Sequence, residues 1–199
     1  MMRPIPRRLI ASLVPGLALA GCISLAAKPP ASLMTLTATA IPAAGQTVSS
    51  ANAPTIAISV PVTPAAIATQ RVPVQTSATA FAYVKDALWS EPPARLFTRL
   101  LSDTVATKTG RVVLSDTQAL GSHGAMLSGQ LSSFGVDEAA GNVVVIYEAT
   151  LRRGPDHVYE KRRFEARSRL PRIDADTVGP ALNRAANQVA SDVAEWVGK

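Results

Sequence analysis

The strongest constraint on the fold is a series of three extended segments joined by short turns, residues 126–136, 143–152 and 158–170. The middle segment alternates most clearly, and its apolar face consists of Val143, Val145, Tyr147, Ala149 and Leu151. Alternation with a period of two predicts β-strands that bury one face. The links are short and contain glycine, so we expect an antiparallel meander in which neighbouring strands form hairpins.

Two segments with helical spacing flank this meander. The first, residues 92–109, opens with two prolines and stops before Gly110, and its apolar face is Leu96, Phe97, Leu100, Leu101 and Val105. Proline suits a first helical turn and glycine suits a helix end. The second, residues 177–197, has an apolar face made of Val178, Leu182, Ala186, Val189, Val193 and Trp196. Both segments are predicted to be amphipathic helices.

The region before the first helix has weaker patterns. Residues 55–62 predict a strand with Ile56, Ile58 and Val60 on one side, and residues 33–38 predict a short first strand. Residues 71–83 suggest an irregular hairpin, in which Pro73 favours a sheet edge. Residues 40–53 are predicted to form a surface loop and residues 111–114 a short strand. We therefore expect an α+β fold, with an antiparallel sheet and two amphipathic helices packed on one face.

The amino-terminal residues are typical of an exported lipoprotein. Three arginines without an acid precede an apolar run at residues 9–20, which is too short to span a bilayer. The next residues complete the sequence Leu19-Ala20-Gly21-Cys22, which resembles the bacterial lipobox. We expect cleavage between Gly21 and Cys22, and lipid attached to Cys22. The predicted organisation is a signal peptide over 1–21, a lipidated tether over 22–32 and a single domain over 33–199.

The charge and the cysteine count restrict the class of protein further. Cys22 is the one cysteine of the chain, so no disulfide supports the fold and a hydrophobic core must do so. The chain has 20 basic and 14 acidic side chains, for a formal charge of +6, but three of the arginines lie in the signal peptide. The basic character of the mature chain is therefore modest, and we expect no nucleic-acid partner.

No residue pattern in the sequence predicts an enzyme. The two histidines, His123 and His157, each lie beside turn-forming residues and lack a companion set of acids or cysteines. Nucleophile-elbow, phosphate-loop and metalloprotease motifs are absent from the sequence. We expect no catalytic residue, no metal and no cofactor apart from the covalent lipid, and we expect alanine at either histidine to leave function unchanged.

The last predicted strand has one mainly basic face. Lys161, Arg163, Arg167 and Arg169 alternate with the residues of the other face, and Glu165 interrupts the basic row. A long strand needs a solvated outer side in any protein, and charges there oppose unwanted pairing, so a solvated surface is the favoured interpretation. The alternative is a contact surface for anionic lipid head groups or for an acidic partner.

One motif links the chain to a known family. Tyr83 is followed by Trp89-Ser-Glu91-Pro92-Pro93 and then by the leucine-bearing helix. This motif, with the order of the predicted elements, resembles the ABC-type transport auxiliary lipoproteins, the family that includes PqiC. Packing of large aromatic residues at the entry to a helix explains Tyr83 and Trp89 equally well, and the two interpretations are compatible.

The resemblance implies a function and partners. Such lipoproteins accompany ABC permease–ATPase pairs and MCE-domain proteins that move lipids or other hydrophobic molecules between the envelope membranes. The implied role is a non-enzymatic adaptor, held by its lipid at the outer membrane and facing the periplasm, since Ile23 is not the aspartate of inner-membrane retention. Two alternatives stay open: a stand-alone structural or assembly lipoprotein, and a lipid carrier with its own cavity. A homo-oligomer is also left open.

Overall fold

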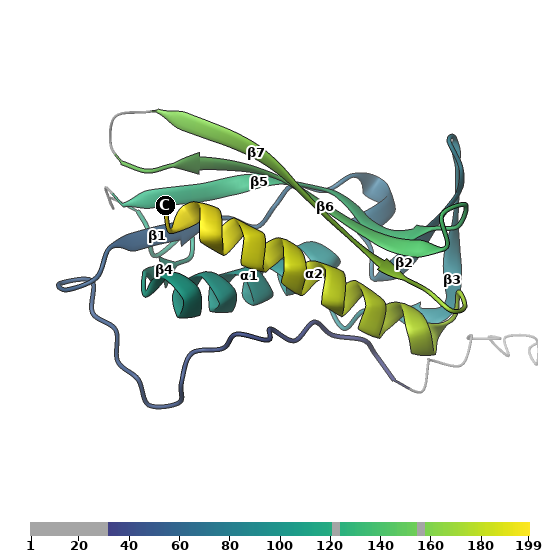
Figure 1. The fold of residues 1–199 in the computed structure, drawn as a ribbon, viewed down its shortest axis with the longest axis horizontal. Coiled ribbons are helices and arrows are strands. Elements are labelled where there is room, and N and C mark those ends of the chain that lie inside the picture. Colours follow the sequence, from purple (N-terminus) through teal and green to yellow (C-terminus); the bar gives the residue numbers. More distant parts are fainter. Residues whose placement is uncertain (1–31, 121–123, 155–157) are drawn as a thin grey trace, which may run out of the picture.

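The structure, a computed structural model, describes residues 32–120, 124–154 and 158–199. The predicted signal peptide, Cys22, most of the tether, His123 and His157 lie outside these ranges. The described elements, shown in Figure 1, are β1 (Thr55–Ile58), η1 (Ala65–Ile67), β2 (Arg71–Ser77), β3 (Ala80–Leu88), α1 (Pro93–Thr109), β4 (Val112–Leu114), β5 (Ala125–Asp137), β6 (Asn142–Arg152), β7 (Tyr159–Arg169) and α2 (Ala175–Val197).

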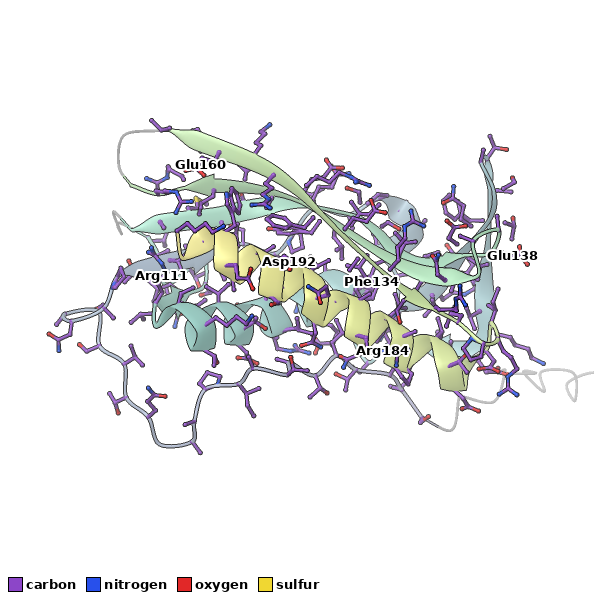
Figure 2. All side chains as sticks on the ribbon, viewed as in Figure 1. Arg111, Phe134, Glu138, Glu160, Arg184 and Asp192 are labelled. Carbon is purple, nitrogen blue, oxygen red and sulfur yellow. The ribbon has the colours of Figure 1, made fainter. Side chains whose placement is uncertain are left out.

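The seven strands form one sheet around β5. The meander of β5, β6 and β7 is antiparallel, as the short turns predict. On its other side β5 pairs with β1 near its start and with β2 near its end, and both pairings are parallel. Outside these, β4 pairs with β1 in parallel and β3 pairs with β2 as an antiparallel hairpin. The turn after β5 also contacts β2, because the Glu138 N–H donates to the Gln75 carbonyl at 3.2 Å (Figure 2).

The prediction of an antiparallel sheet is therefore wrong, because the sheet is mixed, whereas the α+β class with two helices is correct. The short links predicted hairpins correctly, because a two- to five-residue turn reverses the chain. Strands separated by long connections carry no such local signal. Both β1 and β2 pair in parallel with the side of β5 that faces away from β6. These two pairings depend on contacts between residues far apart in the sequence.

The missing amide of Pro73 predicted a position at a sheet edge, and this prediction is wrong. Pro73 belongs to β2, which lies between β3 and β5. The pairing of β2 with β3 shifts register between Arg71 and Pro73, and the pairing with β5 involves Val74 and Gln75. The missing N–H of Pro73 therefore falls where the ladder is already interrupted, which is one of the places where a sheet tolerates proline.

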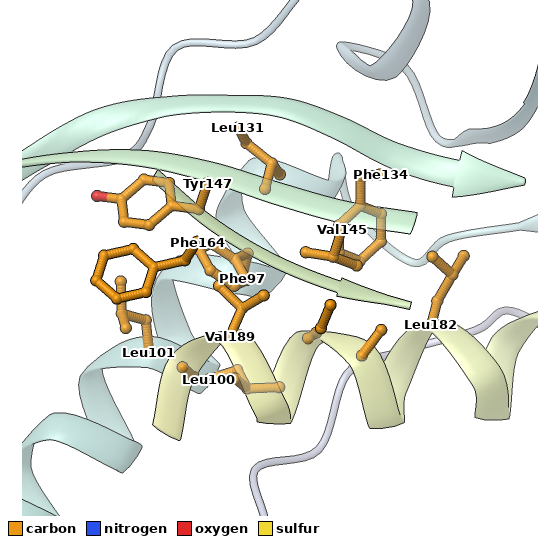
Figure 3. Packing of buried hydrophobic residues seen from close by; sticks show 14 of the residues in the cluster. Phe97, Leu100, Leu101, Leu131, Phe134, Val145, Tyr147, Phe164, Leu182 and Val189 are labelled. Atoms are coloured by element: carbon orange, nitrogen blue, oxygen red, sulfur yellow. The ribbon is translucent and has the colours of Figure 1, made fainter. Parts of the chain in front are cut away.

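The core lies between one face of the sheet and the two helices. Figure 3 shows Phe134 and Val145 pointing from the strands toward α2, which contributes Leu182 and Val189 to the core. The ring of Tyr147 packs edge-on against Phe97 of α1, with 5.3 Å between the ring centroids. The five apolar positions predicted for α1 are all buried, as are the six predicted for α2. Gly110 ends α1 with φ 67°, in the left-handed region that favours glycine. Asp174 caps α2, because its side chain accepts from the Thr177 N–H at 3.0 Å.

Residues 32–53 cross the outer surface of the helices as an extended segment, here called the strap, so the predicted first strand at 33–38 is wrong (Figure 1). Met34 makes one isolated bridge with Trp89. Beyond it, the Thr37 N–H donates to Asn183 Oδ1 at 2.8 Å, and the Thr39 N–H donates to Asn187 Oδ1 at 2.8 Å. Side chains of α2 thus accept the backbone hydrogen bonds that a neighbouring strand would accept in a sheet.

Replacing Asn187 with alanine is expected to loosen the strap and leave the sheet intact. Asn187 is 9% exposed and also donates to the Thr37 carbonyl at 2.9 Å. Asn187 makes two bonds to the strap backbone. At about 1 kcal/mol for each lost bond, amide exchange at residues 37–39 should rise roughly thirtyfold in hydrogen–deuterium exchange measurements. Gln188→Ala, which removes an exposed amide bonded to Asp192 on the same helix, is the matched control. Unchanged exchange in Asn187→Ala would show that other contacts hold the strap.

Another correction concerns the end of the first observed strand. Ile56 and Ile58 are buried as predicted, but Val60 is 53% exposed. The strand ends at Ile58, and the chain bends before it meets β5 again, where the Val62 N–H donates to the Gly129 carbonyl at 3.0 Å. The alternation of residues 55–62 therefore overestimates the length of the strand.

Candidate functional site

The sheet has one face that the helices do not cover, here called the outer face. Along β6, Val143, Val145 and Tyr147 are fully buried toward the helices, so the intervening residues point to the opposite side. The helices themselves are crossed by the strap (Figure 1). The outer face is therefore the largest surface of the sheet available for contact within the described residues.

The basic residues predicted on the last strand all lie on the outer face of β7. They alternate there with Phe164 and Ala166, which are buried against α2. Glu165 forms ion pairs with Arg163 and, at 2.8 Å, with Arg167. The hydrogen bond from Arg167 is the main reason that the pKa of Glu165 lies below its ordinary value.

The charge of this row is only partly balanced. Arg167 also pairs with Asp137 of β5 at 3.2 Å. In the described part of the chain, Lys161 and Arg169 have no ion pair. The exposed pairs contribute little to stability, because water and salt screen them. The uncompensated cations are thus available to an incoming group.

A pocket of about 360 Å3 opens on the outer face where the chain between β1 and β2 leaves the sheet. Ile67 of η1 forms one wall, Phe81 of the β2–β3 hairpin forms another, and Val144 and Ile146 of β6 lie in the lining. Phe81 is 56% exposed, so part of its ring is accessible from the solvent at the pocket. The pocket is mainly apolar, with Arg167 among its lining residues.

A second hollow, of about 630 Å3, lies farther along the same face. Its lining combines apolar residues with Glu148 and Thr150 of β6 and with Lys161 and Arg163 of β7. The register pairs Glu148 with Arg163 and Thr150 with Lys161. An apolar pocket and a basic hollow therefore follow one another along β6.

A third cavity, of about 670 Å3, separates the strap from the second half of α1. It is lined by Ile41 and Val48 of the strap and by Asp103 of the helix. Partial burial raises the pKa of Asp103 above its ordinary value. Ile58 of β1 and the residues of β4 complete the lining, so this cavity lies where the strap, α1 and the edge of the sheet meet.

Trp89 of the family-like motif has a structural position. It is fully buried, and its ring meets Phe134 edge-on at 5.6 Å between centroids. Tyr83, by contrast, lies outside the core, half-buried on the hairpin, with the Arg71 guanidinium 4.0 Å from its ring centroid. Core packing therefore explains the tryptophan but not the tyrosine.

The remaining motif residues form the start of α1. Pro92 precedes the helix and Pro93 is its first residue, where the missing N–H has no intrahelical partner to lose. Glu91 pairs with Arg99 at 2.7 Å, and the hydrogen bond from this arginine holds the pKa of Glu91 below its ordinary value. The motif therefore positions the helix, and none of its residues lines the two outer-face hollows.

The apolar pocket was not among the sequence predictions. One signal for it exists, because residues 143–147 form a continuous apolar run in which Val144 and Ile146 belong to the face expected to be polar. A strand that is apolar on both faces is usually covered on both. Phe81 had no such signal, since a single aromatic residue on a hairpin does not reveal what it faces.

The described residues contain no arrangement suited to metal chemistry. Within residues 32–120, 124–154 and 158–199, no group of three histidine, cysteine, aspartate or glutamate side chains could hold a metal ion. In the same ranges no helix is long and apolar enough to cross a membrane. The phenol of Tyr147 is fully buried without a hydrogen-bond partner, and burial raises its pKa, but it lies in the core away from the pockets.

Comparison with known proteins identifies the family. Residues 35–194 match the family described as the ABC-type transport auxiliary lipoprotein component. The chain belongs to this family. The resemblance seen in the Tyr83–Pro93 motif is thereby confirmed. The auxiliary lipoprotein is thus a transport component of the cell envelope, and its family is not a class of enzymes.

Solved structures share the fold of the auxiliary lipoprotein. A protein from Xanthomonas campestris of the family DUF330 aligns with a TM-score of 0.66 at 16% identity, over 83% of this chain and 94% of that protein. The crystal structure of an uncharacterized protein aligns with a TM-score of 0.63 at 19% identity, over 72% of this chain and 92% of the other. A search among curated proteins finds no significant match.

Proposed function

We propose that this auxiliary lipoprotein is a non-enzymatic adaptor of an MCE-linked ABC transport system that moves lipids or other hydrophobic molecules between the envelope membranes. Lipid on Cys22 would hold it at the outer membrane, and its folded domain would bind the permease–ATPase or the MCE-domain protein. Family membership over residues 35–194 is the observation that carries the proposal.

The outer face supports a role by contact. It combines an apolar pocket with a basic hollow, which together offer the apolar centre and charged rim of a protein interface. The helical face is less suited to this role, because the strap already crosses it.

The test combines a deletion strain with purification of the full chain from detergent-solubilised membranes. The adaptor should co-purify with an MCE-domain protein and with a permease, and the deletion should sensitise the envelope to detergents. Cys22→Ser should remain in the soluble fraction without incorporating labelled palmitate, because three acyl chains at about 0.8 kcal/mol per buried methylene anchor a protein firmly. It should also fail to complement the deletion.

Two results would contradict the proposal. Purification without any transport component, from membranes shown to contain them, would favour the stand-alone structural or assembly lipoprotein. Complementation by Cys22→Ser at wild-type level would show that the lipid anchor is dispensable.

A further inference from the structure

We propose that the outer face binds an extended, acidic segment of a partner protein, with one large apolar side chain in the pocket beside Phe81 and acidic side chains over Lys161 and Arg163. This inference rests on the proposed adaptor function and names the chemistry of its contact. The segment belongs to another chain.

The apolar half of the contact is defined by the pocket. Ile67 is buried in its wall, Ile146 is half-buried in its lining, and Phe81 is 56% exposed beside it. Pockets for small ligands occupy about 300–1,000 Å3, and this one is at the low end with about 360 Å3. It has room for a single leucine or aromatic side chain, and such side chains are the usual anchors of protein interfaces.

The charged half of the contact is defined by β7 and its neighbours. The outer face of β5, β6 and β7 has five basic side chains and three acidic ones within the described residues: Arg152, Lys161, Arg163, Arg167 and Arg169 against Asp137, Glu148 and Glu165. Lys161 lines the second hollow and forms no ion pair with any described residue. Charge complementarity therefore selects an acidic partner and disfavours a basic one.

The spacing of the two hollows sets the distance between the apolar anchor and the acidic residue of an extended segment. Ile146 lines the first hollow and Thr150 lines the second, and both lie on the same face of β6. At about 3.3 Å per residue these four positions span roughly 13 Å. An extended partner would place an acidic residue about four positions from its apolar anchor, whereas a helix would cover only about 6 Å with the same number of residues.

Photo-crosslinking in cells tests the inference with the full, membrane-anchored chain. Benzoylphenylalanine is introduced separately at Phe81, at Lys161 and, as a control, at Gln188, which is exposed on α2 on the opposite side of the sheet. The first two positions should crosslink to one segment of one protein, with acidic residues about four positions from an apolar residue. Gln188 should show no such crosslink.

Two variants make the test specific to the pocket. With the crosslinker at Lys161, Phe81→Ala and Ile146→Asp should each lower the yield about tenfold, the loss expected for an interface anchor worth about 1.4 kcal/mol. Phe81 is exposed on a hairpin, so its variant should melt like the wild type even if Ile146→Asp does not.

The remaining outcomes decide between alternatives. Yields at Phe81 and Lys161 no higher than at Gln188 would overturn the inference, as would crosslinks to phospholipid alone. Crosslinks that map to a helical or basic segment would also overturn it. A crosslinked acidic segment in a protein with no part in transport would leave the inference standing and remove the proposed function instead.

Discussion

Replacement of Trp89 with alanine is expected to lower the free energy of unfolding by about 3–5 kcal/mol, the usual cost of removing a large buried aromatic side chain. Trp89 is fully buried, and its ring packs edge-on against Phe134. Its backbone also joins separate parts of the fold, because the N–H donates to the Gln70 carbonyl at 2.8 Å. A domain of this kind has a margin of about 5–15 kcal/mol, so the variant should be severely weakened.

Urea denaturation of the purified chain, followed by circular dichroism, measures this loss. Phe81→Ala is the matched control, because it removes an aromatic side chain that is 56% exposed and should change stability by no more than about 0.5 kcal/mol. Equal midpoints for Trp89→Ala and the wild type would contradict the burial of the ring. The indole N–H has no hydrogen-bond partner in the described part of the chain, so the predicted loss is one of packing alone.

Gly129→Ala is expected to cost about 3 kcal/mol, at the upper end of the range for an overpacked core. Gly129 lies on β5 opposite Ala149, and a methyl group there would overlap the Glu148 carbonyl oxygen and come within 2.9 Å of a ring carbon of Tyr147. A backbone oxygen in a sheet cannot rotate away as a flexible side chain can. The strand would have to separate locally from β6.

Thermal unfolding measures the effect, with Gly154→Ala as the control. Among the described residues, no heavy atom lies within 4 Å of the position that a Cβ would take at Gly154, so its variant should melt within about 0.5 kcal/mol of the wild type. A Gly129→Ala variant as stable as Gly154→Ala would show that β5 and β6 can separate at this point without cost.

Most of the secondary structure could be predicted, because its signals are local. The meander, both helices and the glycine that ends α1 lie close to the expected positions, and the buried faces of the helices are the predicted ones. The expectations for residues 33–38 and for Val60 failed for a different reason. Short alternating segments do not reveal whether a neighbouring strand exists to pair with them. The N–H groups of Thr37 and Thr39 bond to asparagines of α2 instead.

The candidate site was predicted in part. The basic row on β7 followed from alternation, because successive side chains of a strand point to opposite faces. Its ion pair with Asp137 did not, since Asp137 lies 30 residues from Arg167 and is brought close to it only by the pairing of β5, β6 and β7. The apolar pocket is made from η1, a hairpin and the centre of the sheet, and no contiguous stretch of sequence contains it.

By itself the sequence determined the α+β class, the extents of the long elements, the outward direction of the β7 cations and the family motif. Each of these depends on residue types at fixed short spacings, where period and capping are enough. Only the tertiary structure decided that β1 and β2 run parallel to β5, that the strap crosses the helices, and that Phe81 and Ile146 share a pocket. These features depend on contacts between residues far apart in the chain. Such contacts contribute to stability only once the sheet has formed.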